Sequence, residues 1–135
     1  GDATEKTASD SVRPVLTPAQ IVELQALVRQ LYADERIKGY LVELVAATRE
    51  PRAYGLPELA DFVQYGASPR ATLALLSTAR AHAFLNGRGY VVPEDVKEVA
   101  PDVLRHRVLL SYEAEAENVS SDQVVSRILE RIEVP

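Results

Sequence analysis

The sequence predicts an all-α (mainly α) domain, a bundle of about five helices. Three observations lead to this prediction. The chain has 135 residues, 47% of them hydrophobic and 26% charged, which suits one compact domain with a buried core. Apolar residues recur at spacings of three and four, as on one face of a helix. Serine, threonine and aspartate residues that can cap a helix precede these apolar stretches, and proline often follows the cap.

The composition excludes several classes of protein. The chain has no cysteine, which rules out disulfides and thiolate metal sites and suits a reducing cytoplasm. A net charge of −5 argues against a dedicated nucleic-acid binder. No apolar run reaches the roughly 18 residues that a membrane span needs, and no signal-peptide pattern opens the chain. We therefore expect a cytoplasmic domain that binds no nucleic acid and spans no membrane.

The first ordered element is expected after a polar leader. Residues 1–14 are small and polar without apolar periodicity, so we expect them to be a disordered leader, followed by one helical domain over 15–135. A first helix should begin at Pro18, because Thr17 can cap it and Gln20 completes a capping box. Its apolar stripe comprises Ile21, Leu24, Leu27, Val28 and Leu31.

A second helix should be capped by Asp34 and end near Arg49, because Pro51 disfavours helical geometry in the residue before it. Its apolar stripe comprises Ile37, Tyr40, Leu41, Leu44, Val45 and Thr48. Residues 50–67 contain two prolines and two glycines, which predicts a long ordered loop with a short helical turn around 58–62.

A third helix should start at Ser68-Pro69, a cap followed by proline, and end at Asn86-Gly87. It is apolar nearly all round, which predicts a central helix packed on several sides. The apolar residues concerned are Leu73, Ala74, Leu75, Leu76, Ala79, Ala83, Phe84 and Leu85.

The segment after this helix mixes extended and helical signals. Tyr90–Val92 is expected to be extended, with a very short β pairing as an option. Pro93 opens a fourth helix that should run to about Ala100, and Pro101 should restart a separate turn that ends near Arg105.

The last third of the chain is predicted less completely. For Val108–Tyr112, an extended and a helical conformation both remain open. Ser120 and Gln123 form another capping box, which predicts a final helix. Its apolar stripe comprises Val124, Val125, Ile128, Leu129 and Ile132.

The chain shows no self-sufficient active site. His82 and His106 have no other ligand at metal-binding spacing, so we expect a structural or ion-paired role for each and no metal site. No G-x-S-x-G nucleophile elbow occurs, and none of the three lysines follows a glycine, which excludes a G-x-x-x-x-G-K-[ST] phosphate loop. The alternating glutamates of residues 113–117 are expected on a solvated surface.

Residues 66–71, Gly-Ala-Ser-Pro-Arg-Ala, are the strongest candidate for a binding site. A flexible glycine leads into a helix capped at Ser68, whose first-turn amides should point outward. Free N–H groups and the helix dipole favour an anion at such a terminus. Arg70 lies in that first turn, where its guanidinium could share a phosphate with the helix end. A bland alternative remains open, in which Arg70 pairs with a nearby surface carboxylate.

Arg105-His106-Arg107 is a second basic cluster in an acidic chain. Arg105 and Arg107 are candidate contacts to a phosphate, a neighbouring subunit or an acidic partner. The alternative is that these arginines pair with carboxylates of the same chain, as surface charges commonly do.

Residues 15–50 and 66–125 together resemble the C-terminal lid of MoxR-family AAA+ ATPases. The similarity covers about Val15 to Ile132, which is most of the chain. Its most specific parts are the GASPRA helix start and the LRHR segment at 104–107, in that order and separation.

The resemblance implies that a P-loop core domain precedes the lid and that ATP, with Mg²⁺, binds between the two. Arg70 matches the sensor-2 arginine, which reaches from the lid to the γ-phosphate, and Ser68 and Pro69 would lie beside the nucleotide with it. The resemblance also implies a homo-oligomeric ring, a hexamer, and chaperone-like activation or assembly of client proteins. Proteins with a von Willebrand factor type A domain are the implied partners.

The chain also departs from the family pattern. The phosphate loop, the Mg²⁺-binding acidic motif and the arginine finger would lie in the core domain, so this chain alone should bind no cofactor and hydrolyse no ATP. Val92 stands where a capping serine or threonine is expected, and the loop from Pro51 to Tyr65 has no match. The alternative function is a stand-alone helical protein–protein interaction module. A DNA-binding domain is a second alternative, but it would need a basic face, and the net charge of −5 argues against one.

Overall fold

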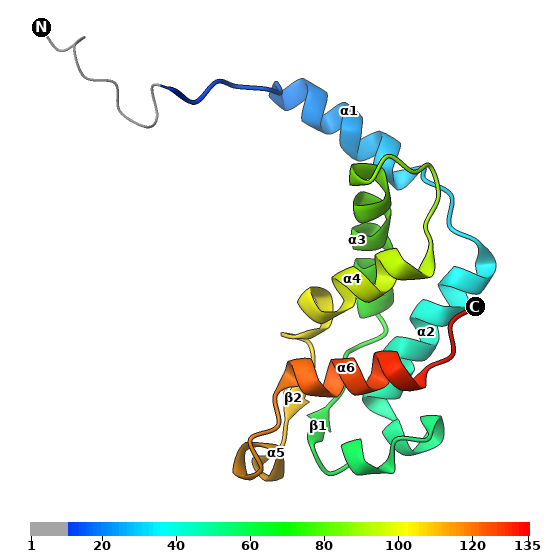
Figure 1. The fold of residues 1–135 in the computed structure, drawn as a ribbon, viewed down its shortest axis with the longest axis vertical. Helices are drawn as coiled ribbons and strands as arrows, with labels where there is room; N and C mark the ends of the chain where they lie inside the picture. Colours follow the sequence, from blue (N-terminus) through cyan, green and yellow to red (C-terminus); the bar gives the residue numbers. More distant parts are fainter. Residues whose placement is uncertain (1–10) are drawn as a thin grey trace, which may run out of the picture.

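The computed structural model describes residues 11–135, and residues 1–10 of the predicted leader (1–14) lie outside them. Within the described residues the chain forms six α-helices, two short 3₁₀ helices and one two-stranded sheet (Figure 1). The predicted mainly α class is confirmed. None of the helices in this part of the chain is long and apolar enough to cross a membrane.

Helix α1 (Pro18–Arg29) begins where its capping box predicts. The Thr17 Oγ1 atom accepts from the Gln20 amide at 3.1 Å, and Gln20 Oε1 accepts from the Thr17 amide at 2.8 Å. The helix packs against α3 but extends away from the other helices, and none of its residues is buried (Figure 1). Ile21 and Leu27 remain 44% and 53% exposed, so the apolar stripe is only partly covered.

Helix α2 (Glu35–Arg49) matches its predicted bounds, and the Asp34 carboxylate caps it by accepting from the Arg36 amide at 2.8 Å. Every residue of its predicted stripe is buried. The loop that follows is ordered by two 3₁₀ helices, η3 (Pro51–Tyr54) and η4 (Pro57–Leu59), so the helical turn expected around residues 58–62 lies slightly earlier.

Helix α3 (Ala71–Leu85) contacts α1, α2 and α4 and is the central helix, as predicted. Its buried residues recur every fourth position, and three of the four are alanines, which lets the neighbouring helices approach closely: Ala71, Leu75, Ala79 and Ala83. Leu73 and Leu85 are 69% and 81% exposed, so the helix is not covered all round.

Helix α4 (Pro93–Leu104) runs unbroken through Pro101, which corrects the prediction of two helical pieces. A proline inside a helix removes one amide donor. The helix continues because the Arg105 amide still donates to the Pro101 carbonyl at 2.9 Å, and because one apolar face is buried on both sides of the proline. Its buried apolar residues are Val96, Val99, Ala100, Val103 and Leu104.

The structure contains two short pairings of extended chain, of which the first was not predicted and the second was given only as an option. Strand β1 (Val63–Tyr65) pairs antiparallel with β2 (Leu109–Leu110), which shows that the undecided segment is extended before α5 (Tyr112–Ala116) begins. The optional pairing at Tyr90 exists as a single parallel bridge to Tyr32.

Helix α6 (Ser121–Arg131) closes the domain against α2 and α4 (Figure 1). Its capping box forms as predicted, with Ser120 Oγ accepting from the Gln123 amide at 3.1 Å and Gln123 Oε1 accepting from the Ser120 amide at 2.8 Å. Val124, Val125 and Ile128 are fully buried and join the core that α2, α3 and α4 build.

Candidate functional site

The loop that carries Arg70 is fixed tightly to the end of α2. A Cβ atom on Gly66 would lie 2.3 Å from the carbonyl oxygen of Thr48, so only glycine fits at this approach of two backbones. The buried Thr48 hydroxyl accepts from the Ala67 amide at 2.9 Å and donates to the Val45 carbonyl at 2.6 Å. The expected flexible glycine is therefore wrong: Gly66 is required for close packing.

The start of α3 also differs from the prediction. Ser68 makes no side-chain hydrogen bond within the described residues, and the regular helix begins at Ala71. The amides of Ala71, Thr72 and Leu73 donate instead to the carbonyls three residues before them, at 2.9–3.1 Å. Because these amides already have partners, an anion at this end would depend mainly on side-chain charge.

The Arg70 side chain is exposed and has no partner within residues 11–135. In that range no carboxylate lies within ion-pair distance of its guanidinium, whereas the side chains of Arg36, Arg88, Arg105 and Arg127 all form ion pairs there. The described part of the chain therefore does not support the alternative in which Arg70 pairs with a surface carboxylate. Ser68 and Pro69 are exposed beside it.

Arg105 forms ion pairs with carboxylates of the same chain, which was the alternative given for it. Its Nε atom lies 2.8 Å from Asp122 at the start of α6, and its Nη1 atom lies 3.1 Å from Asp102. Arg107 donates to the Val103 carbonyl at 2.7 Å, and its side chain is exposed. The cluster thus joins α4 to α6, and a role for Arg105 and Arg107 in contacts with other chains stays a prediction.

A buried carboxylate at the start of α4 is the feature that the sequence analysis missed. Asp95 is 0% exposed and accepts two hydrogen bonds from Arg88, both at 2.6 Å. Its oxygens also lie 2.7 Å from His82 Nδ1 and 2.8 Å from the Val92 amide. We call Asp95, Arg88, His82 and the Val92 amide the Asp95 cluster.

A sequence signal for this cluster was present. Asp95 follows Val92 at the spacing of a capping box. Because the valine side chain has no acceptor for the Asp95 amide, only the half of the box in which the carboxylate accepts from the Val92 amide can form. His82 has a structural role, one of the two that were expected of it, because its Nδ1 atom forms a hydrogen bond with Asp95. Within the described residues, no group of three or more histidine, cysteine, aspartate and glutamate side chains is placed to hold a metal ion.

The Asp95 cluster keeps its carboxyl ionised. Burial by itself raises the pKa of Asp95, but the hydrogen bonds from Arg88, from the Val92 amide and from His82 outweigh it and lower the pKa from 3.8 to about 2. The cluster is therefore an ion pair with a fixed geometry throughout the neutral range.

Acid should weaken the fold through this group. Because the folded pKa lies below 3.8, the stabilisation is complete above about pH 5 and is lost as the pH falls from about 4 towards 2. We expect the difference in free energy of unfolding between the natural chain and Asp95→Asn, measured in urea, to shrink over that range. A difference that stays constant from about pH 6 to pH 2 would contradict the low pKa.

Comparison with known proteins places the chain among ATPase relatives. A profile of the AAA lid domain family matches residues 59–128. The chain is 38% identical over 123 residues to the chaperone MoxR1 of Mycobacterium tuberculosis, covering 91% of this chain and 33% of that protein. It is 36% identical over 126 residues to the uncharacterised protein YeaC of Bacillus subtilis, covering 93% and 37%.

A solved structure shares the fold. The crystal structure of a protein from Cytophaga hutchinsonii, described as a candidate ATPase, superposes with a TM-score of 0.89 at 41% sequence identity, covering 93% of this chain and 38% of that one. The chain spans about a third of the length of the two curated relatives.

Proposed function

Because this chain belongs to the AAA lid domain family, we propose that it is the lid of a MoxR-type AAA+ ATPase, which closes over ATP bound to a P-loop core of the same longer protein. The observation that carries the proposal is the Arg70 guanidinium. It is exposed and has no partner among residues 11–135, and it follows a loop that the Gly66 and Thr48 contacts hold firmly.

The role proposed for this chain in turnover is electrostatic. Arginine is always charged, and its planar fork of donors suits phosphate oxygens. ATP with its Mg²⁺ would supply the γ-phosphate, and the Arg70 guanidinium would add positive charge where negative charge develops during hydrolysis. Ser68 and Pro69 lie beside Arg70 and would line the same cleft.

Lid closure would carry the nucleotide state to other subunits. Helices α2, α3, α4 and α6 share one apolar core, so this part of the domain should move as a rigid body when Arg70 meets or loses a phosphate. By this proposal the parent protein forms a homo-oligomeric, hexameric ring in the cytoplasm and activates or assembles clients as a chaperone does. Arg105 and Arg107 are proposed contacts to a neighbouring subunit or to a partner with a von Willebrand factor type A domain.

Removing the guanidinium tests the proposal. In the longer protein that includes the core, Arg70→Ala should lower kcat for ATP by about tenfold or more, because charge stabilisation of the transition state is lost. Arg70→Lys should lose less, since it keeps the charge but not the fork. The measurement is steady-state ATP hydrolysis.

The matched control is Lys97→Ala, which removes an exposed cation of α4 that has no ion pair in the described residues. It should leave turnover unchanged. The thermal stability of the 135-residue chain should also be the same with and without Arg70→Ala. Turnover that survives Arg70→Ala intact would remove Arg70 from this role.

One observation favours the alternative, a stand-alone interaction module. Helix α1 and α3 flank an apolar groove of about 520 Å³, lined by Leu16, Ile21, Leu24, Val28, Phe84 and Leu85 among others. The complete coding sequence would distinguish the two functions. A P-loop core in the same polypeptide supports the lid, and its absence supports the module.

A further inference from the structure

We infer that the Asp95 cluster is the joint that sets the direction of α1 relative to the rest of the domain. This inference does not depend on nucleotide or on the proposed function, since it concerns only contacts within the described chain. It rests on three observations: α1 joins the body through a short link, the loop between α3 and α4 binds that link, and Asp95 binds that loop.

Helix α1 packs against α3 without a buried residue of its own. Leu24 and Val28 are half-buried, and no other residue of its apolar stripe between Pro18 and Arg29 is less exposed than these. The first buried side chains lie just after the helix, at Leu31 and Ala33. The short link from Gln30 to Asp34 therefore decides where α1 points.

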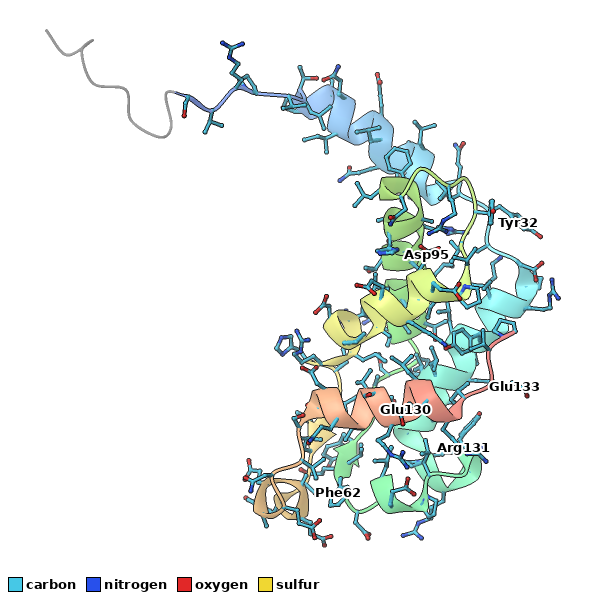
Figure 2. The ribbon with its side chains drawn as sticks, in the orientation of Figure 1. Tyr32, Phe62, Asp95, Glu130, Arg131 and Glu133 are labelled. Carbon is cyan, nitrogen blue, oxygen red and sulfur yellow. The ribbon has the colours of Figure 1, made fainter. Side chains whose placement is uncertain are left out.

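Three hydrogen bonds hold this link to the body. The Arg80 Nε atom of α3 donates to the Leu31 carbonyl at 3.0 Å. The Tyr32 amide donates to the Gly89 carbonyl at 3.3 Å, and the Val91 amide donates to the Tyr32 carbonyl at 2.9 Å. Two of the three bonds thus join Tyr32 to the loop between α3 and α4, which lies beside the Tyr32 label in Figure 2.

That loop is in turn shaped by Asp95. Residues 86–90 contain no buried side chain, and Val91 is the buried apolar residue of this loop, so apolar packing holds the loop only near its end. The two Arg88 nitrogens reach both carboxylate oxygens of Asp95, while the Val92 amide binds the same carboxylate from the other end of the loop. Arg88 also donates to the Tyr90 carbonyl at 3.2 Å.

The Asp95 carboxylate therefore binds both Arg88 and Val92, which flank the residues that pair with Tyr32. The helices α2, α3, α4 and α6 meet through one apolar core, to which residues 86–90 do not belong and which Val91 joins from the end of the loop. Loosening Asp95 should free the loop, then the Tyr32 bridge, and then α1, while the core stays in place.

The absence of cysteine from the sequence makes a clean test possible, because spin labels attach only where cysteine is introduced. Glu23, Glu43 and Glu98 are exposed on α1, α2 and α4. One doubly labelled chain carries Glu23→Cys with Glu43→Cys and reports on α1. The other carries Glu43→Cys with Glu98→Cys and reports on the core. Distances are measured by double electron–electron resonance.

The variant is Arg88→Met, which removes the two bonds to Asp95 and keeps an apolar stem. We expect the α1–α2 distance distribution to widen about twofold or more, while the α2–α4 distribution is unchanged. Arg127→Met is the matched control, because Arg127 forms a surface ion pair with Glu58, at a distance of 2.8 Å, in a part of the domain remote from the joint. This variant should change neither distribution. Equal widening of both distributions, or of neither, would overturn the inference.

Hydrogen exchange of the unmodified chain gives a second measurement, in case Arg88→Met does not fold. The amides of Tyr32, Val91 and Val92 should exchange together through one local opening, at least about tenfold faster than the α6 amides of Val125 and Ile128. If the amides of Tyr32 and Val91 exchange as slowly as those of Val125 and Ile128, no separate joint opens and the inference is wrong.

Discussion

Replacing Gly66 with alanine is expected to lower the free energy of unfolding by about 3 kcal/mol, because over-packing against a rigid surface cannot relax. The new Cβ atom would lie 2.3 Å from the Thr48 carbonyl oxygen and 2.6 Å from the Arg49 nitrogen. Both atoms are backbone at the end of α2, so no side chain can turn away. Either the last turn of α2 or the loop before α3 has to move.

The chain offers a matched control for this substitution. Gly39 lies inside α2, and a Cβ atom there meets nothing within 4 Å. Gly39→Ala should therefore raise stability by about 0.5–1 kcal/mol, since alanine favours the helix. Urea unfolding of the two variants gives the comparison. Equal stability of Gly66→Ala and the natural chain would show that the close approach is not required.

The same substitution should also affect the proposed function. Arg70 follows Gly66 by four residues, and a shifted loop would move its guanidinium away from a phosphate that the core holds in place. In the longer protein, Gly66→Ala should lower ATP turnover even below the temperature at which it unfolds, whereas Gly39→Ala should not.

Replacing Asp95 with alanine is expected to cost about 3–5 kcal/mol of stability, the range seen when one partner of a buried ion pair is removed. The substitution leaves the Arg88 guanidinium, the Val92 amide and His82 without their shared acceptor. The Arg88 and His82 side chains are only 28% and 30% exposed, so water would replace the lost acceptor only in part. The midpoint of thermal unfolding should fall accordingly.

Asp102→Ala is the control for Asp95→Ala. Asp102 lies on the same helix but its side chain is 75% exposed, and its ion pair with Arg105 is at the surface. This variant should change stability by less than about 1 kcal/mol. A double variant, Asp95→Leu with Arg88→Met, should recover part of the loss, because no unpaired charge remains. A loss from Asp95→Ala no larger than that from Asp102→Ala would mean that the cluster contributes little.

Features that depend on neighbours in the sequence were predictable. Thr17, Asp34 and Ser120 cap their helices as predicted, because a cap is a hydrogen bond across two or three residues. The burial of α2 and α6 followed from apolar spacing alone. Arg70 could be selected as a candidate because its loop and its charge are both local features, and the resemblance to a lid pointed to the same residue.

Contacts between distant residues overruled local signals elsewhere. Ser68 precedes a proline as a cap should, yet the bond from Ala67 to Thr48, across 19 residues, decides how the chain enters α3. Pro101 should end a helix, but burial on both of its sides continues it. Strands β1 and β2 pair across more than 40 residues, which no local pattern contains.

Sequence therefore sufficed for the helical class and for the starts of α1, α2, α4 and α6, which follow from short-range hydrogen bonds, proline positions and apolar periodicity, and it selected Arg70 as a candidate from its charge and its loop. The folded chain alone revealed that Arg70 has no partner within residues 11–135, that Gly66 is a packing requirement, and that Asp95 grips the loop beside α1. These properties come from side chains and backbones that meet only after the helices pack, so their energies have no counterpart in any short stretch of sequence.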